Sequence, residues 1–246
     1  MNKKISMEEY KKNQAKFKQI LENQEEIKIW EQLENGCFIG TMGYSEKNIE
    51  TILVLLKSFE EQYGEVIDYE AAKEELMLYQ QKGKLFIYFD PDMNPVSMNG
   101  CIYNYENATV DFISNRPLNS LYFYGLSTVK EYRGKGACRT LIDYSLEFAK
   151  YNNFDYVYAR TDLVNSNSEW IMQRAGLEVC TYEGNIIAEW VDVTEEYGDY
   201  RLHMWKPLTE GITTFPKEDA IFAKDDETRD IIESSPSILQ KTIQTG

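Results

Sequence analysis

Three segments in the first third of the chain repeat hydrophobic residues every three to four positions, which is the spacing of one helical face. The first covers residues 1–35, carries seven Lys and seven Glu, and ends at an Asn-Gly pair. The second covers Ser45–Gly64. The third covers Asp68–Gln81, which begins with a residue able to cap a helix and is followed by the terminator Gly83. This periodicity predicts three helices.

Short apolar runs separated by turn residues follow, and they predict strands. Helices are predicted between the later strands, at Ala137–Tyr151 and Asn165–Ala175. Hairpin turns exclude a wholly parallel sheet, so the expected fold class is α/β, with a mixed, mostly antiparallel twisted sheet flanked by helices. The predicted strands are Cys37–Met42, Leu85–Phe89, Val96–Tyr105, Thr109–Ile113, Leu121–Val129, Asp155–Ala159, Leu177–Tyr182 and Tyr200–Trp205.

These elements divide the chain into three parts. We expect residues 1–36 to form an N-terminal accessory helix that packs on the domain or on a second subunit of a homodimer. Residues 37–208 contain the predicted sheet and form the central domain. Residues 209–246 have eight acidic and four basic side chains and few aromatic ones, so we expect an acidic C-terminal tail.

Composition narrows the choice of partners and compartment. The formal net charge is −15, which argues against nucleic acid as a partner because nucleic-acid binding requires a dense basic surface. The same acidity is compatible with a cationic substrate, such as a free amine, through long-range steering. Alternatively, and more in line with common usage, the acidity only keeps the protein soluble. The longest aliphatic run, Ile52–Leu56, is far shorter than the roughly 20 apolar residues of a membrane helix, and the N-terminal lysines have no apolar stretch behind them. We therefore expect a cytoplasmic protein without a membrane partner.

Cysteine and histidine usage bears on metal binding. The four cysteines are widely spaced, with no C-x-x-C pair, and His203 is the single histidine. A metal centre built on imidazoles is excluded, and the cysteines are expected to be free thiols. We therefore expect no bound metal.

One segment joins a predicted strand to a predicted helix through a basic loop that contains two glycines, at Tyr132–Gly136. The first-turn amides of a helix have no internal partner and carry the positive end of its dipole, so they can bind a phosphate or pyrophosphate. Gly134 and Gly136 would let the backbone approach such an anion closely. The spacing is neither that of a Walker A loop nor that of the dinucleotide G-x-G-x-x-G loop. By itself, the pattern also fits an ordinary turn.

The loop Glu131–Gly136, which reads EYRGKG, resembles motif A of the GNAT superfamily of acetyl-CoA-dependent N-acetyltransferases. The family's loop reads Q/R-x-x-G-x-G/A, and the arginine and the last glycine match it. Asn165 and the later Ala175-Gly176-Leu177 resemble the family's N-x-x-A and x-G-F stretch, with leucine in place of the usual phenylalanine. The resemblance extends over residues 37–208, which it implies are a GNAT N-acetyltransferase domain.

The resemblance implies transfer of an acetyl group from acetyl-CoA to a primary amine, by direct attack in a ternary complex. The strand before the loop would pair its backbone with the pantetheine arm of the cofactor, and the loop amides would hold the pyrophosphate. Asn165 would bind the cofactor arm or fix its own loop. The implied cofactor-binding residues are Leu126, Ser127, Thr128, Arg133, Gly134, Lys135, Gly136, Ala137, Cys138, Arg139 and Asn165.

Two positions depart from the family pattern. Cys138 stands where the family has Gly or Ala, and its thiol either packs under the helix or is made reactive by the helix N-terminus. Met172 stands where the family often has a tyrosine that donates a proton to the leaving CoA thiolate. Tyr124, on the cofactor strand, is the expected catalytic residue, with Glu106 and Asp111 as alternatives for the base.

Two other functions stay open at this point. The chain could be a non-catalytic, CoA-binding regulatory module, in which Met172 marks lost chemistry. Alternatively it could be a protein-interaction scaffold that no longer binds CoA because Cys138 disrupts the loop. Neither alternative changes the expected fold.

Overall fold

The chain divides into two compact units, described separately below. The first contains the residues up to Tyr103 together with Phe123–Asn152, and the second contains Asn104–Tyr122 and the residues from Asn153 onward. The computed structural model describes residues 27–63, 67–103, 110–111, 116–117, 119–162, 166–182, 185–186, 188–192 and 198–212.

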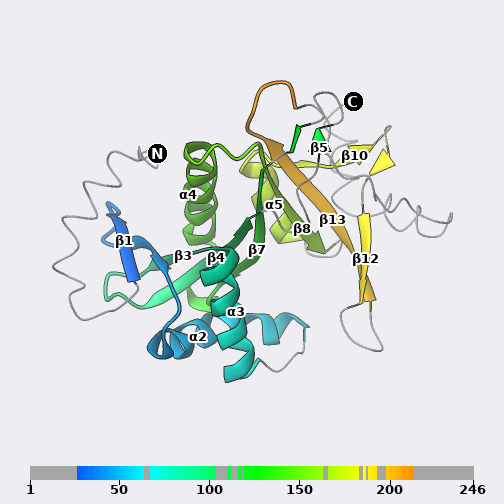
Figure 1. Ribbon diagram of the computed structural model, residues 1–246. Coiled ribbons are helices and arrows are strands. Elements are labelled where there is room, and N and C mark those ends of the chain that lie inside the picture. Colours follow the sequence, from blue (N-terminus) through cyan, green and yellow to red (C-terminus); the bar gives the residue numbers. More distant parts are fainter. Residues whose placement is uncertain are drawn as a thin grey trace. The chain divides into compact units, whose positions relative to one another are not determined.

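The first unit is built on a sheet in which β1 pairs with β2, β2 with β3 and β3 with β4, each pair antiparallel. The next strand in this order is β7, of which the part from Phe123 onward belongs to this unit (Figure 1). The strands are β1 (Ile27–Gln32), β2 (Phe38–Met42), β3 (Gly83–Phe89), β4 (Pro95–Tyr103) and β7 (Ser120–Thr128).

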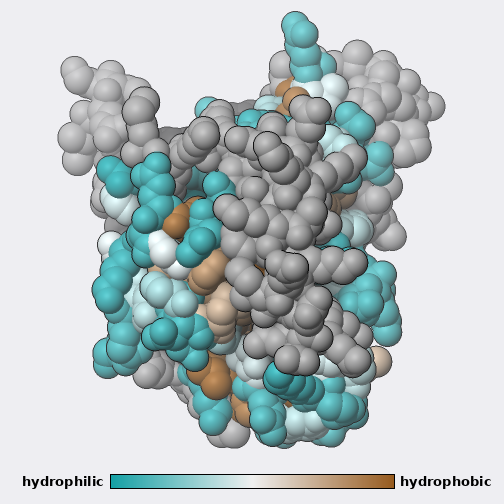
Figure 2. All heavy atoms as spheres, turned by 90° about the vertical axis from the view of Figure 1, so that its left-hand side faces the viewer, coloured by the Kyte–Doolittle hydropathy of each residue, from teal (hydrophilic) through white to brown (hydrophobic). Residues whose placement is uncertain are grey.

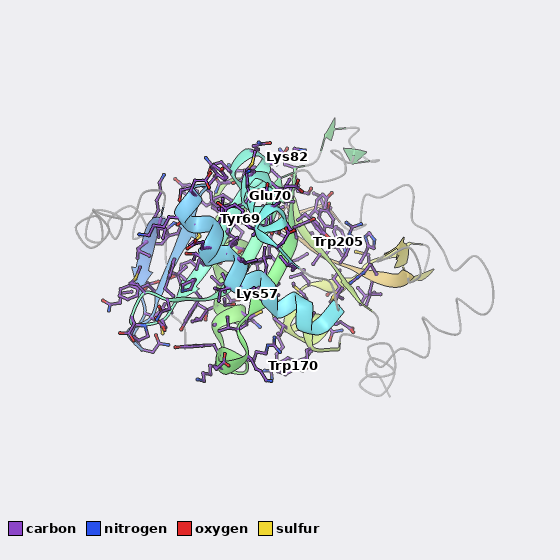
Figure 3. The ribbon with its side chains drawn as sticks, turned by 90° about the horizontal axis from the view of Figure 1, so that it is seen from below. Lys57, Tyr69, Glu70, Lys82, Trp170 and Trp205 are labelled. Carbon is purple, nitrogen blue, oxygen red and sulfur yellow. The ribbon has the colours of Figure 1, made fainter. Side chains whose placement is uncertain are left out.

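Helices cover both faces of this sheet. On β4, the side chain of Asn99 donates a hydrogen bond to Ser145 of α4 at 2.9 Å, whereas the next residue, Gly100, lies against Tyr79 of α3. Because consecutive strand residues point to opposite faces, α4 covers one face and α3 the other. Helix α2 packs beside α3, as Figure 3 shows from below. The helices are α2 (Glu46–Tyr63), α3 (Tyr69–Lys82) and α4 (Ala137–Tyr151).

Local sequence explains where these helices begin and how they pack. The Asp68 carboxylate accepts a hydrogen bond from the amide of Ala71 at 2.9 Å and caps α3, as predicted. Helix α4 buries an apolar stripe that includes Leu141 and Ile142, both fully buried. Next to this stripe, the ring of Phe148 meets that of Phe86 on β3 edge-on, with their centroids 5.4 Å apart.

The second unit is organised around β13, which pairs antiparallel with β8, β12 and β9. Strand β8 is also a neighbour of β7, whose first three residues belong to this unit. The main elements are β8 (Tyr156–Asp162), α5 (Ser166–Arg174), β9 (Glu178–Val179), β12 (Ala188–Asp192) and β13 (Gly198–Pro207). Short hairpins join β5 (Val110–Asp111) to β6 (Arg116–Pro117) and β10 (Thr181–Tyr182) to β11 (Asn185–Ile186).

An aromatic cluster forms the core of the second unit. The rings of Tyr122 and Tyr158 stack with their centroids 4.6 Å apart, and the Tyr122 hydroxyl accepts a hydrogen bond from Nε of Arg160 at 2.9 Å. The members of the cluster are Tyr122, Tyr156, Tyr158, Cys180, Trp205 and Ile212.

The observed elements confirm the predicted fold class, a mixed α/β fold with a mostly antiparallel sheet. The helix predicted over residues 1–35 is wrong over Ile27–Gln32, which form strand β1, and residues 1–26 lie outside the described residues. Ile29 and Trp30 are buried in this strand, and the Trp30 ring meets that of Phe86 edge-on at 5.0 Å. Pairing with β2 and burial of these residues override the local helical periodicity.

The prediction of a C-terminal tail over residues 209–246 is wrong at Thr209 and Ile212. Ile212 is buried in the second unit, and the Thr209 hydroxyl donates to Asp155 at 3.2 Å, while residues 213–246 lie outside the described part. No described helix is long and apolar enough to cross a membrane. Where Figure 2 is coloured, the face on the β1 side is mainly hydrophilic, with a narrow column of hydrophobic residues.

Candidate functional site

The connection from β7 to α4 forms the candidate cofactor site. Strand β7 ends at Thr128, and the amide of the next residue, Val129, donates to the carbonyl of Val96 on β4 at 3.0 Å. A single turn of 3₁₀ helix follows at Lys130–Tyr132, and α4 begins at Ala137. A strand, a tight loop and a helix N-terminus therefore follow one another within the first unit, as the sequence predicted.

Both loop glycines adopt left-handed backbone conformations, with φ of +74° at Gly134 and +90° at Gly136. Residues with a side chain rarely occupy this region, which explains why glycine stands at both positions. A Cβ at either position would have no atom within 4 Å among its described surroundings. The glycines are therefore required by backbone conformation, and they leave open space in front of the loop.

The N-terminus of α4 has no side-chain cap. Gly136 is its N-cap residue, and the first helical bond runs from the amide of Thr140 to the carbonyl of Gly136 at 2.9 Å. The amides of Ala137, Cys138 and Arg139 precede that bond, so they have no acceptor within the helix. These amides and the helix dipole favour an anion at this point.

Two loop amides that the sequence assigned to pyrophosphate binding already have acceptors. The amide of Arg133 donates to the carbonyl of Lys130 at 3.2 Å, and the amide of Lys135 donates to that of Tyr132 at 3.4 Å. Among the described residues, no backbone acceptor faces the amides of Gly134 and Gly136. The amides open to an anion are therefore those of the two glycines and of the first turn of α4.

The basic side chains around the loop have different surroundings. Nε of Arg133 donates to the carbonyl of Thr128 at 3.0 Å, and Nζ of Lys135 lies 4.7 Å from the centre of the Tyr132 ring. Arg139 forms an ion pair with Asp143 at 3.0 Å, one helical turn away. The Arg139 charge is thus partly balanced, whereas the Arg133 and Lys135 side chains lie on the exposed part of the loop.

A buried carboxylate holds the start of the loop in place. Asp90, in the turn between β3 and β4, accepts hydrogen bonds from the amides of Asp92 and Asn94 and from the Tyr132 hydroxyl at 3.1 Å. Burial by itself would raise the pKa of Asp90, but these hydrogen bonds and one from the Asn94 side chain outweigh it and lower that pKa. The ionised carboxylate therefore ties the loop to the sheet.

The end of the predicted cofactor strand is held by hydrogen bonds from neighbouring elements. The Ser127 hydroxyl is buried and donates to the carbonyl of Leu55 on α2 at 2.7 Å. The Ser97 hydroxyl bonds the Ser127 carbonyl at 2.8 Å and lies 2.8 Å from the Thr128 hydroxyl. Leu126 is half-buried. The Ser127 hydroxyl and the carbonyls of Ser127 and Thr128 therefore already have partners within the first unit.

Comparison of the sequence with protein-family models and with curated proteins gives no match. Solved structures do match the fold. An N-acetyltransferase from Staphylococcus aureus has a TM-score of 0.52 at 9% identity, covering 70% of this chain and 97% of that chain. An acetyltransferase of the GNAT family from Desulfovibrio desulfuricans has a TM-score of 0.51 at 9% identity, covering 70% of this chain and 99% of that chain. The chain has the GNAT fold. The resemblance predicted from the loop is thus confirmed at the level of the fold.

Two further solved structures share the fold. NAA60 from Arabidopsis thaliana, solved with a bisubstrate analogue, has a TM-score of 0.52 at 11% identity and covers 69% of this chain and 97% of its own. A ribosomal-protein-alanine N-acetyltransferase from Brucella melitensis has a TM-score of 0.50 at 16% identity, covering 68% of this chain and 99% of that chain. At such identities the likeness concerns the fold alone, so the roles of residues have to be argued from the local geometry of this chain.

Cys138, the first departure from the motif, is half-buried in the first turn of α4. Burial raises the pKa of its thiol to about 12, although the nearby Arg139 charge acts in the opposite direction. The thiol is therefore neutral at ordinary pH, which contradicts the idea of a reactive thiol and supports a packing role.

The predicted catalytic residues are only partly described. Tyr124 lies on β7 with 40% of its surface exposed, and its ring meets that of Tyr79 edge-on, with centroids 6.3 Å apart. Asn165, Glu106 and the Asp111 side chain lie outside the described residues.

Met172 is buried on α5 of the second unit. Its carbonyl accepts hydrogen bonds from the amides of Ala175 and Leu177, both at 3.0 Å. A thioether has no proton to donate, so this position cannot supply the acid expected of a tyrosine.

The structure adds two residues that sequence reasoning missed, Glu75 and Tyr79 of α3. The Tyr79 hydroxyl donates to the Glu75 carboxylate, and its ring faces Tyr124. Neither residue belongs to a motif, because helix periodicity marks Tyr79 only as a core position. The sequence does show a glutamate one helical turn before a core tyrosine, which permits a hydrogen bond between them. It does not show which strand the helix packs against.

Proposed function

We propose that this chain is an N-acetyltransferase that transfers an acetyl group from acetyl-CoA to a primary amine. The observation that carries the proposal is the uncapped N-terminus of α4, preceded by a loop with two left-handed glycines in a GNAT fold. The amides of Gly134, Gly136, Ala137 and Cys138 would bind the pyrophosphate of CoA.

The remaining cofactor contacts follow from the direction of the chain. A pantetheine arm that leaves the pyrophosphate would run back along β7 and pair with the main chain of Leu126–Thr128 as an added strand. Lys135 and Arg133 would contribute positive charge at the exposed rim of the loop. Asp90 would act indirectly, because it holds Tyr132 and therefore the start of the loop.

The transfer itself requires little covalent participation by the protein. The lone pair of a neutral amine attacks the thioester carbonyl, and the tetrahedral intermediate expels the CoA thiolate. A thiolate of this kind has a conjugate acid pKa of roughly 8.5, so it can leave without the tyrosine that Met172 replaces. Holding the amine and the thioester together in one ternary complex would supply most of the rate.

Thermal unfolding with and without acetyl-CoA, followed by free-thiol release in the presence of amines, tests this function. The amine panel contains spermidine, an aminoglycoside, free lysine and a peptide with an unblocked N-terminus. We expect acetyl-CoA to raise the midpoint of unfolding, because only a ligand of the native state stabilises it. We also expect thiol release that depends on an amine.

The alternative function is a non-catalytic CoA-binding module, favoured by the buried methionine at position 172. It predicts stabilisation by acetyl-CoA with no thiol release for any amine of the panel. If millimolar acetyl-CoA leaves the unfolding midpoint unchanged, the loop is only a turn and the proposed transferase activity is refuted.

A further inference from the structure

A buried tyrosine of α3 reaches the centre of the sheet opposite two glycines. Tyr79 is 2% exposed, and its hydroxyl end lies against Gly100 on β4 and Gly125 on β7. A Cβ built at Gly100 would lie 2.0 Å from the Tyr79 hydroxyl oxygen, and one at Gly125 would lie 2.5 Å from it. Both strands therefore need glycine at these positions, and the phenol is held in one place.

The Tyr79 hydroxyl in turn holds a carboxylate beside β7. Glu75 lies one helical turn earlier and accepts the hydrogen bond from Tyr79 through Oε1. The same oxygen would lie 3.3 Å from a Cβ at Gly125, so it lies against the middle of β7. Glu75 is only half-buried, whereas Tyr79 is fully enclosed. Of the two side chains, Glu75 is therefore the less buried.

The carboxylate is next to the part of β7 where the acyl group of a bound cofactor would lie. An arm that starts from the pyrophosphate at Gly136 and pairs with Leu126–Thr128 next reaches Gly125 and the exposed Tyr124. The Tyr124 ring faces Tyr79 edge-on, so the tyrosines and the glutamate form one cluster within the first unit. An acceptor amine that attacks this acyl group would therefore have to lose its proton near Tyr124 and Glu75.

We propose that Glu75 is the general base of the acetyl transfer, and that Tyr79 is a positioning residue that fixes the Glu75 carboxylate beside Gly125. The proposal rests on the transferase function proposed above. Glu75 lies on α3, near the start of which Figure 3 labels Tyr69 and Glu70.

The proton balance of the reaction is simple. An acceptor that binds as an ammonium gives one proton to the Glu75 carboxylate and becomes a neutral amine. The C–N bond forms as the carbonyl π electrons move to oxygen, and their return breaks the C–S bond and releases the CoA thiolate. The second nitrogen proton passes to that thiolate to form CoA thiol. The Glu75 carboxylic acid then returns its proton to water, and no other reagent is needed.

The surroundings of Glu75 suit this role. Burial raises the pKa of the Glu75 carboxyl, and the hydrogen bond from Tyr79 offsets part of that rise. The other titratable groups that act on Tyr79 among the described residues are Tyr124 of β7 and Cys101 of β4. The Cys101 thiol lies on the opposite face of the sheet, against Ser145 of α4. No described charged side chain of α2 contributes to the shift at Glu75. A raised carboxyl pKa brings the base closer to the pH at which the reaction runs.

The test compares full-length wild type with Glu75→Gln, Tyr79→Phe and the control Glu74→Gln, which changes the exposed neighbour on the same helix. The acceptor is the amine of the panel with the fastest thiol release, and kcat is measured against pH at saturating substrates. We expect Glu75→Gln to lower kcat by about 10²–10⁴-fold and to abolish the fall of kcat at low pH. Glu74→Gln should retain the wild-type profile.

Tyr79→Phe tests the positioning role through the pH dependence of kcat, which a purely structural role of Tyr79 would leave unchanged. Removing the hydroxyl removes the hydrogen bond that lowers the pKa of Glu75, so the low-pH limb of kcat should shift to higher pH. Acetyl-CoA should stabilise each variant against thermal unfolding as much as wild type, which shows that the cofactor site is intact.

The outcomes separate failure of the Glu75 assignment from failure of the transferase function. If wild type turns over and Glu75→Gln keeps at least a third of the wild-type kcat, Glu75 is not the general base. The transferase function is unaffected by that result. An unshifted low-pH limb in Tyr79→Phe also contradicts it, even if Glu75→Gln fails to fold. Absence of amine-dependent thiol release in wild type refutes the transferase function, and the assignment of Glu75 with it.

Discussion

Replacing Gly136 by alanine tests whether the loop before α4 binds phosphate or is only a turn. Gly136 has φ of +90°, and a Cβ there would meet no described atom within 4 Å. The cost to the free protein is therefore backbone strain alone, about 1–2 kcal/mol for a residue with a side chain in the left-handed region. For a domain of this size, that cost corresponds to a fall of roughly 2–8 °C in the unfolding midpoint.

The effect on cofactor binding should be larger than the effect on stability. At acetyl-CoA concentrations of about 100 times Kd, wild type should gain about 2.7 kcal/mol, or roughly 5–11 °C. The new methyl group and the relaxed backbone would remove one charge-assisted hydrogen bond, worth about 1.5–3 kcal/mol. A weakening of about 100-fold would reduce the stabilisation to about 0.4 kcal/mol at the same concentration, or about 1 °C.

Gly211→Ala is the matched control for this experiment. Gly211 also has φ of +90° and no described atom within 4 Å of a Cβ, but it lies in the second unit, far from the loop in sequence. Thermal unfolding of both variants, with and without acetyl-CoA, should show similar losses of stability, and only Gly136→Ala should lose the cofactor-induced shift. A Gly136→Ala protein that keeps the full wild-type shift would refute the assignment of the loop.

Three further outcomes can be checked by simpler measurements. The folded state lowers the pKa of Asp90, so the ionised carboxylate stabilises the fold at pH values above its unfolded pKa of about 3.9. This stabilisation is lost as the pH falls through the folded-state pKa. Asp90→Asn should therefore flatten the acid limb of a plot of unfolding free energy against pH. Gly125→Ala should destabilise the protein to urea by about 1–3 kcal/mol, and Tyr79→Phe should relieve part of that cost because the clash is with the hydroxyl oxygen, so additive losses would contradict this geometry. The thiol of Cys138, whose pKa is raised to about 12, should react slowly with iodoacetamide at pH 8, and alkylation as fast as that of a free thiol, followed by peptide mapping, would contradict its burial.

The connection between β7 and α4 could be predicted from the sequence because its physics is local. A short apolar run forms the strand, two glycines permit left-handed backbone, and an apolar stripe begins directly after them at Ala137. The predicted helix, Ala137–Tyr151, coincides with α4, and the helices at α2 and α3 were predicted to within one or two residues. Each depends on periodicity and caps within its own segment.

Strand β1 shows where local reasoning fails. Residues Ile27–Gln32 continue a helical spacing of apolar side chains, yet they pair with β2 and bury Trp30 against Phe86 of β3. The partners lie in other segments of the chain, so no window around the strand contains the deciding interactions. The boundary between the two compact units, which falls between Tyr122 and Phe123 within β7, also depends on contacts between segments that are distant in the sequence.

The sequence by itself thus determined the α/β fold class, most helices and the glycine loop, because each is written in residues close to one another along the chain. Only the tertiary structure decided that Tyr79 fills the space above Gly100 and Gly125 and holds Glu75 against β7. Those residues belong to three different elements, and a carboxylate acquires a shifted pKa and a defined position only when packing brings such elements together.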